Sequence, residues 1–280
     1  MKKRTKENIG LVIANIVLIL LCFMVLIPVL YAFSVSLNAD NSLLSANFSF
    51  LPKHFTLANY KAVFTEKPIM LWLKNSLVLA IVTLGISLGT GIPAAYVFSR
   101  KDFPGRRAIL RMLILLYAFP SLLSMTALYK LLSPMGLINT RTGLIIVYTG
   151  TMAVFALWNM KGYFDTIPVE IEEAAMIDGC SPIQTYFQVV FPILKPTAIT
   201  VAILQVMWIW NDYLLPYLVL DIRKWKTIPI AIQYLKGGYG SIDWGAMMAM
   251  LVLAILPIII FYGICQKYII EGVVAGAVKG

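Results

Sequence analysis

Long apolar runs without charge alternate with short polar stretches along most of the chain. A helix needs about 20 apolar residues to cross a bilayer. Six runs approach or exceed that length, at residues 10–33, 75–99, 112–129, 142–160, 196–220 and 244–266. The pattern predicts an all-α integral membrane protein with about six transmembrane helices, in one transmembrane domain over residues 1–280. Counts of five or seven stay open, because the third run is short and Pro120 interrupts it.

The positions of Lys and Arg predict the orientation of these helices. Basic residues precede the first run, at Lys2, Lys3, Arg4 and Lys6, and follow the second, at Arg100, Lys101, Arg106, Arg107 and Arg111. Such residues concentrate on the cytoplasmic side. An even number of spans would therefore place both termini in the cytoplasm. We interpret Arg100–Arg111 as this topology signal rather than as a site for lipid or nucleic acid.

Composition supports a lipid environment and excludes several functions. Only 13% of the residues are charged, whereas soluble domains carry about 25%. The net charge is +10, but the Lys and Arg residues flank apolar runs, as expected for orientation in a membrane. We therefore expect no nucleic-acid partner. The three cysteines lack metal-ligand spacing, His54 is the sole histidine, and the sequence has no P-loop. We therefore expect no metal site, no catalytic residue and no cofactor in this chain.

The polar segment 161–195, between the fourth and fifth runs, contains the pattern of a short helix. Pro168 suits a first helical turn, and the acids that follow favour the positive end of the helix dipole. Ala174 and Ala175 favour helix, and Gly179 can end it in a left-handed conformation. The pattern alone fits either a surface helix that caps the bundle or a helix that docks a partner.

This segment also carries a sequence motif. Glu173-Ala174-Ala175 is followed by three residues, Gly179, nine residues and Val189-Val190-Phe191-Pro192. It resembles the EAA loop of ABC-importer permeases of the binding-protein-dependent sugar type, and in particular the second permease of the maltose type. Val189 and Phe191 depart conservatively from the Ile and Leu of that pattern. Residues 55–60, 210–216 and 271–280 resemble the same family.

The resemblance implies a role for the short helix and a set of partners. In that family the EAA loop is a cytoplasmic coupling helix that fits into the ATP-hydrolysing subunit. The residues implied to do so here are Glu172, Glu173, Ala174, Ala175, Asp178 and Gly179. The implied partners are a second homologous permease, two ATP-binding subunits that hold ATP and magnesium, and an extracellular or periplasmic solute-binding protein. The implied location is a bacterial-type cytoplasmic (inner) membrane, crossed several times and surrounded by lipid.

Asp212 is the one carboxylate well inside a predicted span. A charge there is costly, so it should face a cavity or a partner. With Trp210, Asn211 and Tyr213 it offers aromatic faces and hydrogen-bonding groups that could contact a sugar. Aromatic residues also gather at membrane interfaces, and Asp212 could serve only to hold helix ends together.

Three rival functions remain open at this stage. An importer of a non-sugar solute would have the same architecture. An ion-coupled secondary transporter needs intramembrane charges, for which only Asp212 qualifies. A membrane enzyme needs a cluster of acids or a metal, and the only acidic cluster, Glu170–Asp178, has a spacing that suits a helix surface better.

Overall fold

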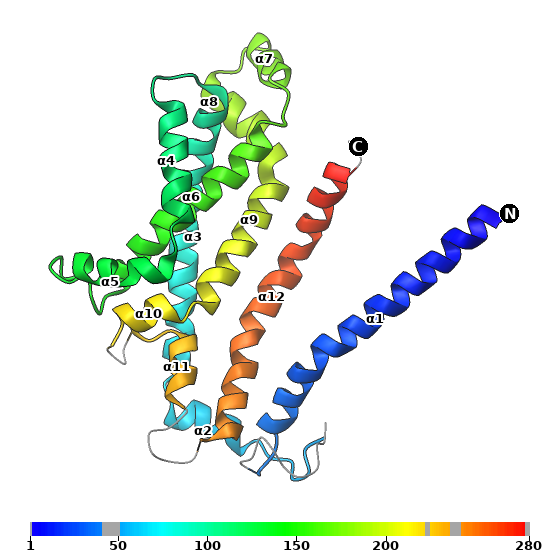
Figure 1. Cartoon of the computed structure of the whole chain (residues 1–280), viewed down its shortest axis with the longest axis vertical. Helices are drawn as coiled ribbons and strands as arrows, with labels where there is room; N and C mark the ends of the chain where they lie inside the picture. Colours follow the sequence, from blue (N-terminus) through cyan, green and yellow to red (C-terminus); the bar gives the residue numbers. More distant parts are fainter. Residues whose placement is uncertain (1, 41–50, 222–224, 236–241, 278–280) are drawn as a thin grey trace. The chain divides into compact units, whose positions relative to one another are not determined.

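Figure 1 shows a computed structural model of the chain, in which residues 2–40, 51–221, 225–235 and 242–277 are described. Over these ranges the chain is helical, and its only extended pairing is an isolated bridge between Asn38 and Phe55. In the described part of the chain, five helices are long and apolar enough to cross a membrane, and a bent pair of helices would provide a sixth crossing if it is one span. The predicted all-α membrane fold is confirmed.

The long helices are α1 (Lys2–Ser36), α3 (Ile69–Arg100), α6 (Arg141–Phe164), α9 (Phe191–Asn211) and α12 (Trp244–Ala277). The shorter ones are α2 (Ala58–Glu66), α4 (Arg106–Ala118), α5 (Ser121–Leu132), α7 (Glu170–Ile177), α8 (Pro182–Gln184), the π-helix η1 (Thr185–Val190), α10 (Leu214–Val219) and α11 (Ile228–Tyr234). The side chains of residues 2–9, 121, 234 and 269–277 lie outside the description, as does all of 278–280. The structure therefore gives no contacts for the basic N-terminus or for the tail 271–280.

The third predicted span, 112–129, is two helices rather than one. α4 and α5 meet at Pro120 and are bent by 102°. Pro120 has no N–H to donate, and it disfavours the helical conformation at the preceding residue. Phe119 accordingly adopts extended dihedrals, with φ −68° and ψ 130°.

The chain divides into two compact units, and each is described by itself. The first contains residues 1–70 and 232–256. In it the amide of Asn59, on α2, donates to the carbonyls of Ser36 (3.0 Å) and Asn38 (2.9 Å) at the end of α1. Asn59 packs on Gly245, where a Cβ would lie 2.6 Å from the Asn59 side chain. Asn59 belongs to the stretch 55–60, so this part of the family resemblance has a structural role in joining α1, α2 and α12.

The second unit contains residues 71–231 and 257–280. Its long helices α3, α6 and α9 are joined midway by a buried polar residue, Gln205. The Gln205 amide donates to the carbonyl of Met152 on α6 (2.9 Å), and its oxygen accepts from the Ser87 hydroxyl on α3 (2.6 Å). Gln205 and Ser87 are fully buried. Two apolar clusters lie on either side of this junction, one around Tyr148 and Ile209 and the other around Phe164 and Leu194.

Candidate functional site

α7 is a short helix at one end of the second unit, beyond the ends of α3 and α6 (Figure 1). Its first turn contains Glu170, Glu172 and Glu173, where the helix dipole favours negative charge. Its last turn ends at Gly179, whose φ of 91° is left-handed. Gly179 N–H donates to the Met176 carbonyl (3.1 Å), and Cys180 N–H donates to the Ala175 carbonyl (3.0 Å). This pair of bonds is the Schellman ending, which glycine adopts without steric cost.

The side chain of Glu172 connects α7 to α3. The residue is 3% exposed. It accepts from the Tyr96 hydroxyl (2.8 Å) and from Arg100 Nε (2.6 Å). Arg100 Nη2 also donates to the carbonyl of Ile167, just before α7 (2.9 Å). The sequence motif groups Glu172 with the residues expected to touch a partner, but the structure points it inward.

The remaining residues of the motif are divided between two faces of α7. Ala175 is 8% exposed and packs inward with Glu172. Four others are exposed: Glu173, Ala174, Asp178 and Gly179. Ile177, next to Asp178, is 86% exposed, and Ile183 and Phe187 in the following helices α8 and η1 are exposed as well. Exposed apolar side chains next to charged ones are typical of a surface that contacts protein or membrane. Pattern reasoning did not single out Ile183 or Phe187, because their exposure depends on how the helices after α7 fold back.

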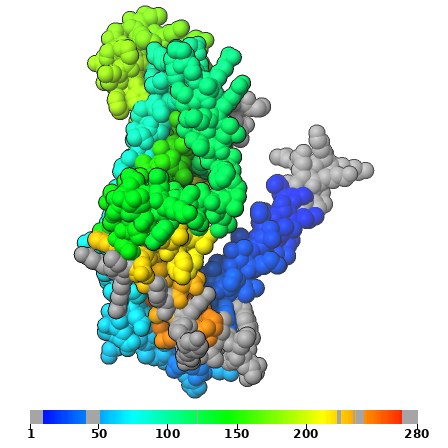
Figure 2. All heavy atoms as spheres, turned by 60° about the vertical axis from the view of Figure 1, so that its left-hand side comes forward, coloured from blue at the N-terminus to red at the C-terminus, as the bar shows by residue number. Residues whose placement is uncertain are grey.

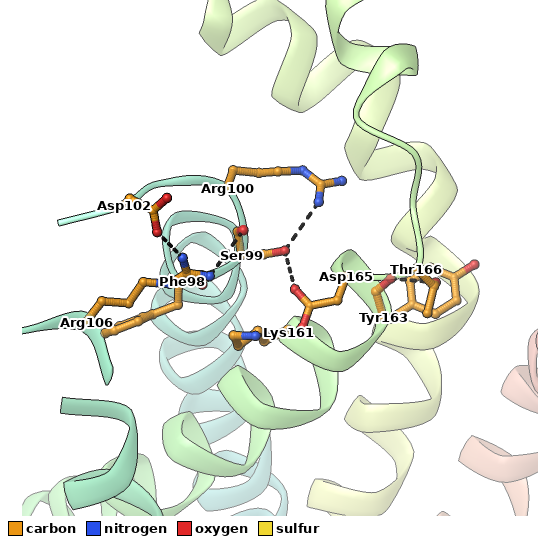
Figure 3. Close-up of polar contacts among 9 residues, drawn as sticks. All are labelled: Phe98, Ser99, Arg100, Asp102, Arg106, Lys161, Tyr163, Asp165 and Thr166. Carbon is orange, nitrogen blue, oxygen red and sulfur yellow. Dashed lines mark hydrogen bonds and ion pairs between the residues drawn. The ribbon is translucent and has the colours of Figure 1, made fainter. Parts of the chain in front are cut away.

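A polar network at the ends of α3 and α6 supports this arrangement (Figure 3). Asp165 accepts from the Ser99 hydroxyl (2.6 Å) and from Lys161 Nζ (2.6 Å). Burial raises the pKa of the Asp165 carboxyl, but these two hydrogen bonds and the charges of Lys161 and Arg100 outweigh burial and lower it. Asp165 is therefore ionised near neutral pH and ties the end of α6 to α3.

Asp212 ends α9 at the other end of the second unit. The predicted helix over 196–220 is interrupted here, because Asp212 has extended dihedrals (φ −69°, ψ 127°) and α10 starts only at Leu214. The carboxylate of Asp212 accepts from the Tyr148 hydroxyl (2.6 Å) and from Leu214 N–H (3.0 Å). It thus satisfies backbone that the break leaves unpaired, and it fixes the turn to α6.

The surface at this turn is hollowed. A hollow of about 590 Å³ is lined by Leu204, Met207, Trp208, Asn211, Asp212, Tyr213 and Leu214. Three of the four predicted contact residues line it, whereas Trp210 is 5% exposed and packs inside. Trp208, two residues earlier, is 58% exposed and offers an aromatic face to the hollow instead. The helical period separates the two tryptophans by about 200°, which residue type alone does not reveal.

α9 links the two regions. Its 21 residues span about 30 Å at a rise of about 1.5 Å per residue. It runs from η1, which contacts α7, to the hollow at Asp212. Within the described ranges, no group of three His, Cys, Asp or Glu side chains is placed to hold a metal ion. The helix α9 thus joins an exposed surface at α7 to a distant, mostly apolar hollow that contains the Asp212 carboxylate.

Comparison with known proteins agrees with this arrangement. The diacetylchitobiose uptake system permease protein of Streptomyces coelicolor is 32% identical over 95% of this chain and 88% of its own length. The trehalose/maltose transport system permease protein of Thermococcus litoralis is 30% identical over the full length of both chains. The galactooligosaccharides transport system permease protein of Bacillus subtilis is 30% identical over 99% of this chain and 98% of its own.

A solved structure and a family model complete the comparison. One chain in the crystal structure of a bacterial ABC transporter involved in the import of the acidic polysaccharide alginate has the same fold, with a TM-score of 0.80 and 23% identity. The match covers 94% of this chain and 98% of that one. The model of the binding-protein-dependent transport system inner membrane components matches residues 87–274, which include α7, α9 and the hollow. The chain belongs to this family of transport system components.

Proposed function

We propose that this chain is the translocation subunit of an ATP-driven importer for a sugar or oligosaccharide. Its relatives include permease proteins named for diacetylchitobiose, trehalose/maltose and galactooligosaccharides, which favours a carbohydrate over another solute. The observation that carries the mechanism is the buried Glu172–Arg100 pair (2.6 Å), which holds an otherwise exposed helix against a membrane span.

A displacement of α7 would be transmitted to the membrane spans through two connections. The first is the Glu172–Arg100 pair, which joins α7 to the last residue of α3. The second is η1, which contacts α7 and continues directly into α9. A short helix held at both its flanks transmits rigid-body motion, whereas a loose loop would absorb it. We infer that α7 couples movement of ATPase subunits to the helices around the hollow, by alternating access.

The partners follow from this role. The exposed outer face of α7, with Glu173, Ala174, Asp178 and Gly179, would fit an ATP-binding subunit. We propose two such subunits, which hold the ATP and magnesium, together with a second homologous permease and an external solute-binding protein. The chain would lie in the cytoplasmic (inner) membrane with both termini and α7 in the cytoplasm.

The hollow at Asp212 is our candidate for sugar contact within this chain. Trp208 offers a ring face for stacking, while Asn211 and the Asp212 carboxylate offer groups for hydroxyls. Asp212 already accepts from Tyr148 and Leu214, so its remaining lone pairs are those available to a sugar. The second permease would complete the pathway.

The test is co-purification followed by transport. The tagged chain is expressed with its neighbouring genes and purified in detergent, and mass spectrometry identifies what accompanies it. We expect an ATPase and a second permease. The complex in proteoliposomes should then accumulate a carbohydrate only with internal ATP and the external binding protein. Uptake driven by a proton or sodium gradient without ATP, or turnover by the chain alone, would replace this proposal with a secondary transporter or an enzyme.

A further inference from the structure

The turn between α3 and α4 carries a basic hollow that the proposed function does not use. We propose that this hollow binds the phosphate of an anionic phospholipid through Arg107 and Arg111, with the acyl chains along α4. Lipid binding of this kind goes beyond the coupling role of α7, and it can be measured on the chain without its transport partners.

Charge in the hollow is unbalanced. Its volume is about 530 Å³, and it is lined by Asp102, Phe103, Gly105, Arg106, Arg107, Ala108 and Arg111. Arg106 pairs with Asp102 and donates to the carbonyl of Phe98 (2.9 Å), so these two charges cancel. Arg107 and Arg111 have no ion pair or hydrogen bond from their side chains in the described part of the chain. The hollow therefore presents two uncompensated guanidinium groups.

These two arginines suit a phosphate group. Arg107 and Arg111 are four residues apart on α4 and so lie on the same face of the helix. A guanidinium presents a planar fork of donors that matches phosphate oxygens. α4 starts directly after Gly105, which has no side chain to cap its first N–H groups, so the positive end of the helix dipole adds to the same field.

The stripe of α4 that carries the arginines becomes apolar further along. Leu115 lies one more turn beyond Arg111 and is 71% exposed. Met112, Ile114 and Leu116 beside it are exposed as well. Figure 2 shows α4, in blue-green, with one face open on the surface of its unit. A phosphate at the arginines would thus place two acyl chains on Leu115 and its neighbours, which a free phosphate ion could not exploit. The sequence alone favours a topology signal here, and the hollow and this stripe are what the structure adds.

The hollow also adjoins the residues that hold α7. Arg106, at its wall, reaches back to Phe98, the residue before Ser99 (Figure 3). Ser99 bonds Asp165, and the next residue, Arg100, pairs with Glu172. A lipid bound at Arg107 and Arg111 would therefore sit against the end of α3 that anchors α7. The content of anionic lipid in the membrane can therefore affect how α7 is held at this point.

Native mass spectrometry of the purified full chain in detergent tests the proposal. The chain is titrated with phosphatidylglycerol and, separately, with phosphatidylcholine of the same acyl chains. We expect a saturable phosphatidylglycerol adduct and no comparable phosphatidylcholine adduct. Arg107→Gln and Arg111→Gln should each weaken the adduct about fivefold, as expected for a contribution of ~1 kcal/mol per basic residue at an anionic surface.

Two further variants separate a defined site from general attraction. Lys101→Gln removes an exposed charge from the same connection but outside the hollow, and it should leave the affinity unchanged. Leu115→Gln keeps every charge and should still weaken the adduct, and inorganic phosphate should not displace it. Equal losses in Lys101→Gln and Arg107→Gln, equal binding of both lipids, or displacement by inorganic phosphate would each overturn the proposal.

Discussion

The carboxylate of Glu172 is the buried charge of α7. Both of its protein partners, Tyr96 and Arg100, come from α3. Glu172→Gln leaves the Arg100 guanidinium beside a neutral amide. Breaking a buried pair in this way costs about 3 kcal/mol. We expect a lower unfolding temperature for the purified variant in detergent.

A matched change on the outer face of the same helix provides the control. Glu173 is exposed. Glu173→Gln should leave stability within about 0.5 kcal/mol of the unmodified chain, while it weakens capture of the ATPase subunit. If Glu173→Gln destabilises the chain as much as Glu172→Gln does, the inward assignment of Glu172 is wrong.

Gly179 ends α7 in a conformation that other residues resist. A Cβ added there meets no atom within 4 Å, so Gly179→Ala tests backbone strain alone. The left-handed conformation costs an L-residue about 1–2 kcal/mol. Amides of α7 should therefore exchange hydrogen about 5- to 30-fold faster in the variant.

The comparison for Gly179 is a glycine inside a helix. Gly162, in α6, has a free Cβ position and no left-handed φ. Gly162→Ala should slow exchange locally, because alanine is the better helix former. Unchanged α7 exchange in Gly179→Ala would show that the Schellman ending does not hold this helix.

Asp165 gives the fold a pH dependence with a defined sign. Its folded pKa is lowered, so its contribution to stability is present above the unfolded pKa of about 3.9 and is lost as pH falls through the folded value. The difference in unfolding temperature between the unmodified chain and Asp165→Asn should be constant from pH 7 to about pH 5 and should shrink below that. A difference that grows toward acid pH would contradict this sign.

At the scale of elements, Gln205 joins three spans at one point. Gln205→Leu removes both of its interhelical bonds, to Met152 and from Ser87. Interhelical hydrogen bonds in membranes contribute about 0.6 kcal/mol each, with a maximum near 1.7. We expect a loss of about 1–2 kcal/mol in the unfolding free energy measured in mixed micelles. Thr90→Val serves as the control, because the Thr90 hydroxyl bonds only carbonyls of its own helix.

The sequence pattern predicts a helix well when the residues of that helix alone determine where it forms. The runs 75–99 and 142–160 lie wholly inside α3 and α6, since length and apolarity are enough to define a span. The pattern also predicts a helix that ends at Gly179, because the signals for its start and end are local.

The sequence pattern does not predict the direction of a side chain when that direction depends on a residue far away in the sequence. The inward direction of Glu172 depends on Arg100, 72 residues earlier. The hydrogen bond that Asp212 accepts at the end of α9 comes from Tyr148, 64 residues earlier, which the local sequence does not reveal. The choice between Trp208 and Trp210 depends on which side of α9 faces the rest of the bundle.

At the scale of the whole molecule, the bent α4–α5 pair decides whether the chain crosses the membrane five or six times. Lys101, before the pair, and Met135, after it, are both exposed. In a chain whose native cysteines are replaced by alanine, Lys101→Cys should react with an impermeant thiol reagent only from the cytoplasmic side, and Met135→Cys only from the outside. Labelling of both from the same side would make the pair a re-entrant segment and would leave five spans.

Because α7 has a buried face and an exposed face, the residues that contact a partner can be exchanged between permeases separately from those that hold the helix in place. Glu172 and Ala175 are buried against the chain's own residues, while Glu173, Ala174, Ile177 and Asp178 are exposed. The two sets can therefore change independently of each other. If only the exposed residues of α7 are transferred from one permease to another, the recipient should bind the ATP-binding subunit of the donor. It should keep its own contact between α7 and α3 and its own transported solute.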